Sequence, residues 1–427
     1  MQCRRACIAS DQRGQWSVRA VQNADRAMFA KKHSDERRVN MRIIVEAPPK
    51  GWITNPEDGH RHKEMFSNLI VACLDVFDDV QVAKTRSGLD TLPRTAGPNE
   101  CRIAFHSRGV SRNVWHLKEA PIPPYYSLDR TGFSGWSEIA NNELLQQAAL
   151  SMDIETANAV LEKQRSEFLR TKLSKYSQPT GRIDIKNYIF HPTQVLTDPV
   201  AELAYVNNID LIEKLAECAK KFSRNVVIKR HPLCKSNSIS EFLKKIEKTN
   251  PYVHIINANI HDLIMGSDCV VVINSGVGLE AIFHGKPVYA AGKSEYSFSV
   301  NEIHSISDVE AIFMAKEHKK AKKQAQVAAY MLSYYWINST NISNIVNRLK
   351  KIRSDAEERT SNELSLNRNV DNNEILKLNV RLEEVIRENL GLKSELLIAK
   401  KMLVGNKLLH SFNEIIHSML SKLQVFK

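Results

Sequence analysis

The sequence lacks any apolar run long enough to cross a membrane. Its most apolar windows, such as Cys269 to Ile273, are far shorter than the ~20 residues that a membrane-spanning helix needs. It also lacks the hydrophobic core of a secretory leader. The seven cysteines are scattered, and outside the first forty residues no two of them are spaced like a metal knuckle or a redox pair. We therefore expect no transmembrane span and a reducing cytoplasmic location, with peripheral association at the inner membrane left open.

Patterns for binding metals and nucleic acids are missing as well. The chain has no Asp-x-Asp motif, and His60 and His62 have no further ligand at a useful spacing, so no metal or other cofactor is expected. Aromatic and basic residues do not alternate at helix or sheet spacing, which argues against a nucleic-acid partner. The formal charge of +12 suits a nucleotide, an acidic glycan or a membrane surface rich in anionic lipid, without choosing among them.

The chain does have enough apolar material for two cores, with 427 residues of which 43% are hydrophobic. Its first forty residues are Arg-rich and aperiodic, and they hold +5 of the net charge. We predict that residues 1–40 are a disordered basic tail or a wrongly included upstream start, and we exclude them from the fold.

Between residues 41 and 180, short β-type runs alternate with helical ones, which indicates a parallel sheet covered by helices. The predicted strands are Met41–Glu46, Val80–Lys84, Arg102–His106 and Asn113–Leu117. A helix is predicted at His62–Phe77, and a polar aromatic loop at Pro121–Gly135 precedes one long helical segment at Trp136–Leu173.

A polar break at Ser174–Arg182 resets the pattern, and residues 181–305 repeat it. The predicted strands are Tyr188–His191, Asn225–Lys229, Val253–Asn257, Asp268–Ile273 and Pro287–Ala290, with helices at Ile209–Phe222, Ile239–Lys248 and Gly278–Phe283. The same α/β architecture twice, joined by a short linker, predicts a GT-B fold, in which two Rossmann-like domains face a central cleft. A single large α/β domain is the alternative.

After Ile306 the chain is predicted to be helical to its end. Residues 306–360 would be a helical return segment, and residues 361–427 a coiled-coil-like extension. Apolar residues from Ile375 to Leu403 follow alternating three- and four-residue steps, and the polar Asn389 occupies a matching core position. A homo-oligomer could form through this extension. The alternative is an amphipathic helix packed on the body.

The sharpest local pattern is a buried strand that ends at Asn274 and Ser275 and continues through Gly276 and Gly278 into a helix. We expect the glycines to permit a tight turn. The unpaired N–H groups of the helix start would then form, with the Ser275 hydroxyl, a cradle for a nucleotide phosphate. Glu280 could accept hydrogen bonds from ribose hydroxyls, or simply complement the helix dipole. Strand, glycine turn and helix also occur together as plain structure.

A second pattern brings Lys229, Arg230 and His231 to the carboxyl end of a buried strand, which Pro232 prevents from continuing. Ligands collect at the carboxyl ends of strands in open α/β sheets. His231 is thus placed to meet a phosphate or a leaving group with two cations beside it, although a lone histidine is more often structural.

Two carboxylates are candidates for the chemistry. Asp198 follows Gln194 after the first strand of the second domain, so both side chains should lie at the domain junction. Asp198 could be a nucleophile toward an anomeric carbon, or an ordinary helix N-cap with Pro199 at the first helical position. Glu138 ends a polar aromatic loop of the type that lines carbohydrate sites. It is either a general acid/base or a surface glutamate at a helix start.

In their order and spacing these segments resemble the bacterial capsule and O-antigen polysaccharide synthesis group that contains the β-Kdo transferases. The matching elements are Gln194-x-x-x-Asp198, His231-Pro232, Asn274–Glu280 with Gly285-Lys286-Pro287, Pro48–Trp52 and Gly132–Glu138. The resemblance spans roughly Met41 to Lys350. The Arg-rich start and the coiled-coil-like end depart from the group.

The resemblance implies a metal-independent GT-B enzyme that transfers Kdo from CMP-Kdo to a cell-surface polysaccharide or glycolipid with retention. Asp198 would form an aspartyl-glycosyl intermediate, and Glu138 would be the acid/base for the acceptor hydroxyl. His231 and Ser275 would bind the CMP phosphate, and Glu280 would hold the ribose. Lys229 and Arg230 would supply positive charge, and the donor site would also include Gln194, Asn274, Gly276 and Gly278.

Two other functions remain open. One is a GT-B transferase for another donor, such as CMP-sialic acid or a UDP- or GDP-sugar, held in the same cradle. The other is a non-catalytic protein whose coiled coil recruits partners to an α/β scaffold. The joint presence of Asp198, His231 and Ser275 argues against the second, because a scaffold has no need of them.

Overall fold

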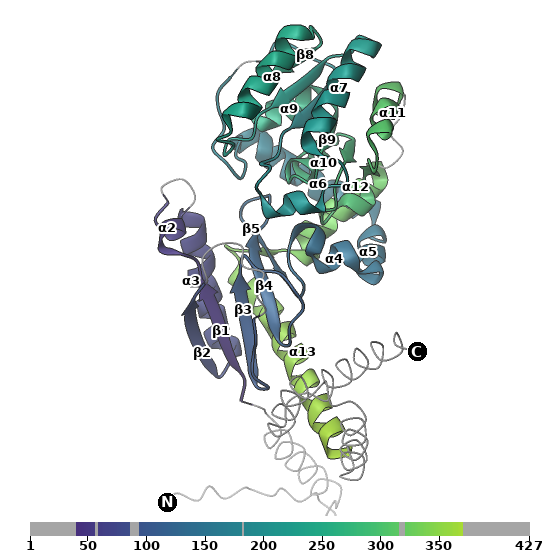
Figure 1. Cartoon of the computed structure of the whole chain (residues 1–427). Helices are drawn as coiled ribbons and strands as arrows, with labels where there is room; N and C mark the ends of the chain where they lie inside the picture. Colours follow the sequence, from purple (N-terminus) through teal and green to yellow (C-terminus); the bar gives the residue numbers. More distant parts are fainter. Residues whose placement is uncertain (1–39, 56–58, 86–93, 182, 316–320, 370–427) are drawn as a thin grey trace, which may run out of the picture. The chain divides into compact units, whose positions relative to one another are not determined.

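The computed structural model describes residues 40–369, apart from 56–58, 86–93, 182 and 316–320 (Figure 1). The described residues contain two six-stranded sheets, each built mainly from parallel strands and covered by helices. This confirms the predicted α/β fold class with two Rossmann-like halves. The predicted coiled coil from Ile375 to Leu403 and all but the last residue of the predicted tail lie outside the described residues. Oligomerisation and membrane association therefore stay predictions.

The first sheet has the strand order β12-β5-β4-β3-β1-β2. Its strands are β1 (Arg42–Ala47), β2 (Asp79–Lys84), β3 (Glu100–Phe105), β4 (Val114–Glu119), β5 (Tyr125–Asp129) and β12 (Ile337–Asn338). Alternate residues such as Met41, Ile43 and Val45 form a core with helix α3 (Gly59–Val76) and the first part of α13 (Ile342–Asn369), which Figure 1 shows alongside the strands. A short helix, α2 (Lys50–Ile53), precedes α3.

The sequence predictions were wrong at three places in this half. The predicted loop Pro121–Gly135 contains β5, which pairs antiparallel with β4 and buries Tyr126. The segment predicted to be helical after Ile306 contains β12, which pairs antiparallel with β5. In both places the neighbouring strand satisfies the backbone hydrogen bonds of a segment too short to show a period of its own.

The third error concerns the predicted long helix Trp136–Leu173. It is broken into a 3-10 turn η1 (Ser134–Trp136) and the helices α4 (Glu138–Asn141), α5 (Glu143–Leu150) and α6 (Ile154–Thr171). The side chains of Asn142 and Asp153 each accept backbone N–H bonds as N-caps of the next helix. These side chains compete with the helical ladder, so each starts a new helix.

The second sheet is parallel throughout and has the order β11-β10-β9-β6-β7-β8. Its strands are β6 (Tyr188–Pro192), β7 (Val226–Lys229), β8 (Val253–Ile255), β9 (Ser267–Val272), β10 (Val288–Ala290) and β11 (Asn301–Glu302). Its helices are η2 (Pro199–Leu203), α7 (Asn208–Phe222), α8 (Asn237–Thr249), α9 (Ile260–Gly266), α10 (Val277–Phe283), η3 (Ser297–Ser299), η4 (Ile306–Asp308), α11 (Val309–Met314), α12 (Ala321–Tyr330) and the π-helical η5 (Met331–Tyr335).

Both faces of this sheet are apolar, as expected for a parallel sheet that is covered on both sides. Tyr188 and Phe190 face a core that includes α9, α10 and α12, whereas Ile189 faces a second core with α7, α8 and α11. The first core also takes in Ala120 and Ile122, which follow β4. The two halves thus share packed apolar residues, and the carboxyl ends of β6, β7 and β9 meet the end of β4.

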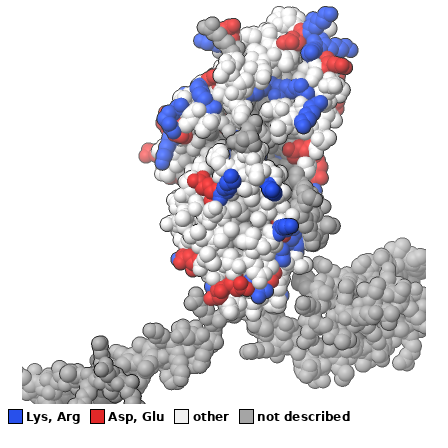
Figure 2. All heavy atoms as spheres, turned by 90° about the vertical axis from the view of Figure 1, so that its left-hand side faces the viewer, with Lys and Arg blue, Asp and Glu red and all other residues white. Residues whose placement is uncertain are grey.

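The surface charge carries both signs. On the face shown in Figure 2, Lys and Arg are interspersed with Asp and Glu, and the positive charge does not form one broad patch there. In the part of the chain that the structure describes, no helix is long and apolar enough to span a membrane.

Candidate functional site

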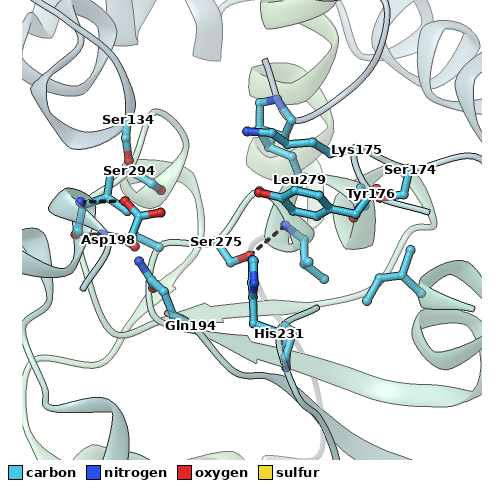
Figure 3. Close-up of a pocket in the computed structure, with 18 of the residues that line it drawn as sticks. Ser134, Ser174, Lys175, Tyr176, Gln194, Asp198, His231, Ser275, Leu279 and Ser294 are labelled. Atoms are coloured by element: carbon cyan, nitrogen blue, oxygen red, sulfur yellow. Dashed lines mark hydrogen bonds between the residues drawn. The ribbon is translucent and has the colours of Figure 1, made fainter. Parts of the chain in front are cut away.

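A cavity of about 230 Å³ lies between the two halves, at the carboxyl ends of β6, β7 and β9 (Figure 3). Its lining includes nine of the eleven residues that the sequence predicted for the site: Gln194, Asp198, Lys229, Arg230, His231, Asn274, Ser275, Gly276 and Glu280. Three loops that are far apart in the sequence are therefore brought together. The other two predicted residues, Gly278 and Glu138, are not among the lining residues.

Asp198 is exposed to the cavity and also caps a helix. Its Oδ1 accepts the backbone N–H of Val200 at 3.1 Å, and Pro199 follows as the first residue of η2. The N-cap interpretation is therefore correct, and it leaves the second carboxylate oxygen available. Gln194 lies near Asp198 in Figure 3, and its buried Oε1 has no hydrogen-bond partner among the described residues.

His231 is fixed by two hydrogen bonds. Its backbone N–H donates to Thr193 Oγ1 at 3.0 Å, and its Nδ1 accepts the backbone N–H of Leu233 at 3.1 Å. An Nδ1 that accepts a bond leaves the ring proton of the neutral imidazole on Nε2. Burial lowers the pKa of His231, against the opposing charge of Asp198, so the ring is neutral at pH 7 and offers one N–H donor. The Tyr176 ring meets it edge-on, with 5.3 Å between the ring centroids.

The turn after β9 packs closely against Pro121 and Tyr296. The Oγ of Ser275 accepts the backbone N–H of Val277 at 3.3 Å, which leaves the hydroxyl proton free to be donated. A β-carbon on Gly276 would lie 2.4 Å from Pro121 Cβ, and one on Gly278 would lie 2.2 Å from the hydroxyl oxygen of Tyr296. Neither glycine has a positive φ. They are needed because a side chain would not fit, not because the turn needs an unusual backbone conformation.

Lys229 and Arg230 are already engaged. Lys229 Nζ donates to Gln178 Oε1 at 2.9 Å and to the Ala258 carbonyl at 2.7 Å. Arg230 Nη2 donates to the carbonyls of Cys234 and Ser236 at 2.6 and 2.9 Å, and so holds the loop after β7. Both residues line the cavity, but much of their bonding capacity is used within the protein.

Glu280 sits opposite Lys229 in the wall of the cavity. Burial raises the pKa of Glu280 to about 7, against a hydrogen bond from Ser174 and the charge of Lys229. Burial also lowers the pKa of Lys229 to about 8, with Glu280 opposing. The carboxyl group therefore changes charge close to neutral pH.

Several lining residues escaped the sequence analysis. Lys118 and Glu119 end β4, Lys175 and Tyr176 belong to the linker, and Glu295 follows β10. Burial raises the pKa of Glu295 to about 8, so this carboxyl group is protonated at neutral pH. Lys118 and Glu119 could have been predicted as site residues, because two charged residues stand at the end of an apolar strand. Lys175 and Tyr176 could not, because the linker has the composition of an ordinary break between domains.

Glu138 lies at the first position of α4. Its backbone N–H donates to both carboxylate oxygens of Asp129, at 3.2 and 3.0 Å. Asp129 also accepts the backbone N–H groups of Thr131 and Gly132 and the Tyr335 hydroxyl. Glu138 therefore begins a helix and is half-buried, and Asp129 organises the loop that the sequence resemblance singled out.

Comparisons with known proteins add a family match for the second half. Residues 184–342 match the family described as "Capsule polysaccharide biosynthesis protein". No curated protein sequence matches the chain.

In the described part, no group of three or more His, Cys, Asp or Glu side chains is arranged to hold a metal.

Solved structures match at low identity. The β-Kdo 2,4 transferase of Thermosulfurimonas dismutans KpsC is 15% identical with a TM-score of 0.43, covering 74% of this chain and 99% of that one. The β-Kdo 2,7 transferase of the same protein is 19% identical with a TM-score of 0.39, covering 73% and 100%. The UDP-GlcNAc 2-epimerase of Methanocaldococcus jannaschii is 13% identical with a TM-score of 0.31, covering 69% and 100%.

Proposed function

We propose that this chain, whose residues 184–342 belong to the capsule polysaccharide biosynthesis family, transfers Kdo from CMP-Kdo to a polysaccharide or glycolipid acceptor. The observation that carries the proposal is the convergence of Asp198, His231 and Ser275 on one cavity. A carboxylate beside two neutral hydrogen-bond donors suits a sugar attached to a single phosphate. The motifs of these three loops also resemble those of the β-Kdo transferases.

The CMP part of the donor would be held by the second half. The Nε2–H of His231 and the hydroxyl of Ser275 would donate to the phosphate oxygens as the phosphate becomes a leaving group. The ionised carboxylate of Glu280 would accept hydrogen bonds from the ribose hydroxyls. Because burial raises the pKa of Glu280 to about 7, this contact would strengthen as the pH rises through neutrality.

The sugar would be transferred in two displacements at Asp198. In the first, a carboxylate oxygen of Asp198 attacks the anomeric carbon, and the bond to the phosphate oxygen breaks with its electron pair leaving on CMP. In the second, the acceptor hydroxyl attacks the same carbon, loses its proton to a base and releases the carboxylate. Each displacement inverts the carbon, so the product retains the donor configuration.

Two glutamates are candidates for the group that takes the acceptor proton. The resemblance implies Glu138, whose backbone is bound to Asp129. Glu295 lines the cavity, and because its pKa is about 8 it would act as a base only above neutral pH, where the carboxyl group is ionised. Comparing Glu138→Gln with Glu295→Gln separates them. The variant of the true base should lose transfer to the acceptor while the first displacement continues.

The test of the proposal is CMP release and sugar transfer by the full chain with a panel of donors. CMP-Kdo should support turnover, and CMP-sialic acid, UDP-sugars and GDP-sugars should not. Asp198→Asn is the decisive variant because asparagine keeps the helix cap and removes the nucleophile. It should bind CMP normally and transfer no sugar. Wild-type turnover by Asp198→Asn, or turnover with another donor alone, would contradict the proposal.

A further inference from the structure

Three side chains that the sequence did not predict as site residues line the wall of the cavity. Lys118 lies near the end of β4, Ser127 lies on β5, and Lys175 belongs to the linker. Lys118 and Ser127 are direct partners in the antiparallel register of β4 and β5, so their side chains leave the sheet on the same face. All three residues line the cavity. Figure 3 shows Lys175 beside Tyr176, in the same cavity as Ser275, His231 and Asp198.

The two lysines share the carboxylate of Glu119. Lys118 Nζ and Lys175 Nζ both contact Glu119 Oε1, at 2.8 and 3.2 Å. The other carboxylate oxygen of Glu119 is bound to His106 Nε2 at 2.5 Å. Burial lowers the pKa of His106 to about 4, so the imidazole is neutral at pH 7. The carboxylate of Glu119 is therefore shared by both lysines, and the charge of Asp198 also acts on Lys118.

The two lysines are more exposed than the carboxylate that they share. The Glu119 side chain is only 5% exposed, whereas the side chains of Lys118 and Lys175 are 16% and 27% exposed. All three residues line the cavity, and Glu119 fixes the positions of the two ammonium groups. A bound anion would contact the lysines without first displacing Glu119.

The hydroxyl of Ser127 is an independent sign of a ligand. Ser127 is 2% exposed, and its Oγ has no hydrogen-bond partner among the described residues. A buried hydroxyl without a partner is unfavourable, and an incoming acceptor would satisfy it. Together, two cations and one hydroxyl donor form a site that only accepting, negatively charged groups can satisfy.

The cations on the opposite side of the cavity are less available. Lys229 is bonded to Gln178 and Ala258, and Arg230 is bonded to the loop carbonyls of Cys234 and Ser236. Glu280 further compensates Lys229. Lys229 and Arg230 therefore use hydrogen bonds within the protein, whereas Lys118 and Lys175 share the carboxylate of Glu119.

We propose that Lys118, Lys175 and Ser127 bind the carboxylate of the donor's sugar and so select an acidic sugar for transfer. This inference rests on the proposed function. In a 2-keto acid sugar such as Kdo the carboxylate is attached to the reacting carbon, so its binding site must lie beside the nucleophile. The proposed carboxylate site meets this condition, because Asp198 lines the same cavity and its charge acts on Lys118 and on His231.

The experiment is a calorimetric titration of the full chain with CMP and, separately, with CMP-Kdo. All variants carry Asp198→Asn so that the donor is not consumed. Lys118→Met, Lys175→Met and Ser127→Ala should each weaken CMP-Kdo binding and leave CMP binding unchanged. The loss should be about 10- to 100-fold for each lysine, as for a hydrogen bond to a charged group. Lys118→Arg should restore part of it, and Lys186→Met, at an exposed lysine outside the cavity lining, should change neither affinity.

The outcomes distinguish this inference from the proposed function. An equal loss of CMP and CMP-Kdo affinity would make the lysines phosphate contacts and overturn the inference alone. Unchanged CMP-Kdo affinity in all three variants would overturn it as well. If the parent protein binds CMP and CMP-Kdo equally, the proposed donor itself is wrong. Circular dichroism of each variant confirms folding, and Ser127→Ala, the smallest change, provides a test even if a lysine variant does not fold.

Discussion

The hydroxyl of Ser174 donates a hydrogen bond to Glu280 Oε1 at 2.5 Å. The linker between the two halves thereby contacts the carboxyl group for which we propose ribose binding. Gln178, four residues along the same linker, accepts bonds from Lys229 Nζ and from the backbone N–H of Ile260. The linker is therefore a wall of the site as well as a connection, and it helps to set the charge of Glu280.

The first prediction concerns Glu280 and the pH dependence of stability. Its pKa is about 7 in the folded chain against an ordinary value of 4.5, so the folded state binds more protons between these values. The contribution of Glu280 to the free energy of unfolding therefore falls as the pH rises from 4.5 through 7. The free energy of unfolding of Glu280→Gln, taken relative to that of the wild type, should rise by about 3 kcal/mol between pH 4 and pH 8, as measured by denaturant unfolding.

A matched control for that series is Glu217→Gln, because the Glu217 side chain is 63% exposed. Its difference from the wild type in the free energy of unfolding should be small. A difference between Glu280→Gln and the wild type that is the same at pH 4 and pH 8 would show that Glu280 titrates normally.

The second prediction concerns the close approach at Gly278. A β-carbon there would lie 2.2 Å from the hydroxyl oxygen of Tyr296, a buried residue whose hydroxyl is bonded to the Ser275 carbonyl. Because the ring has no room to move away, Gly278→Ala should cost about 1–3 kcal/mol of stability and weaken CMP binding through Ser275. Gly97→Ala is the control, since its β-carbon would meet its nearest neighbour at 3.7 Å. Equal stability of the two variants would be inconsistent with this packing.

The third prediction concerns the donor N–H of His231. His231→Ala should weaken CMP binding about 10-fold or more, the usual effect of losing a hydrogen bond to a charged group. His231→Gln should recover part of the affinity, because its amide nitrogen can donate from nearly the same place as Nε2. His304→Ala, at a side chain that is 62% exposed, is the control for calorimetry. Wild-type CMP affinity in His231→Ala would remove the imidazole from the phosphate site.

The fourth prediction concerns how α13 is attached to the first sheet. Arg353 donates to the Val76 carbonyl at 2.5 Å, to Asp78 at 2.8 Å and to Glu357 at 2.7 Å, and its side chain is 9% exposed. Arg353→Met should destabilise the fold by about 1–3 kcal/mol, because it takes this donor from the buried Val76 carbonyl and removes the ion pairs with the partly exposed Asp78 and Glu357. Arg165→Met, at a side chain that is 45% exposed, should cost less than about 1 kcal/mol. Similar losses in the free energy of unfolding of the two variants would show that the attachment of α13 does not depend on this contact.

The sequence predicted the fold well where the elements are long and periodic. The parallel strands around Tyr188 and Val226 were recognisable because both of their faces are apolar. β5 and β12 were missed because each is stabilised by a neighbouring strand rather than by a pattern of its own. The breaks at Asn142 and Asp153 were missed because the apolar period continues through both N-caps.

The candidate site was predicted from three loops at strand ends, and the cavity contains residues from all of them. Lys175 and Tyr176 could not be found from their linker, whose composition is that of any polar connection. The hydrogen bonds of Lys229 and Arg230 could not be predicted from the sequence either, because their partners Gln178 and Ser236 become neighbours only in the folded chain. Strand ends show where a ligand binds, whereas the pairing of charges depends on the tertiary structure.

The most direct test of the account is mass spectrometry of the full chain after incubation with CMP-Kdo in the absence of acceptor. The account predicts that the protein gains the mass of one Kdo residue and that peptide mapping locates it on Asp198, with no gain in Asp198→Asn. An adduct on another residue, or rapid transfer to acceptor with no adduct at any time, would contradict the double displacement at Asp198.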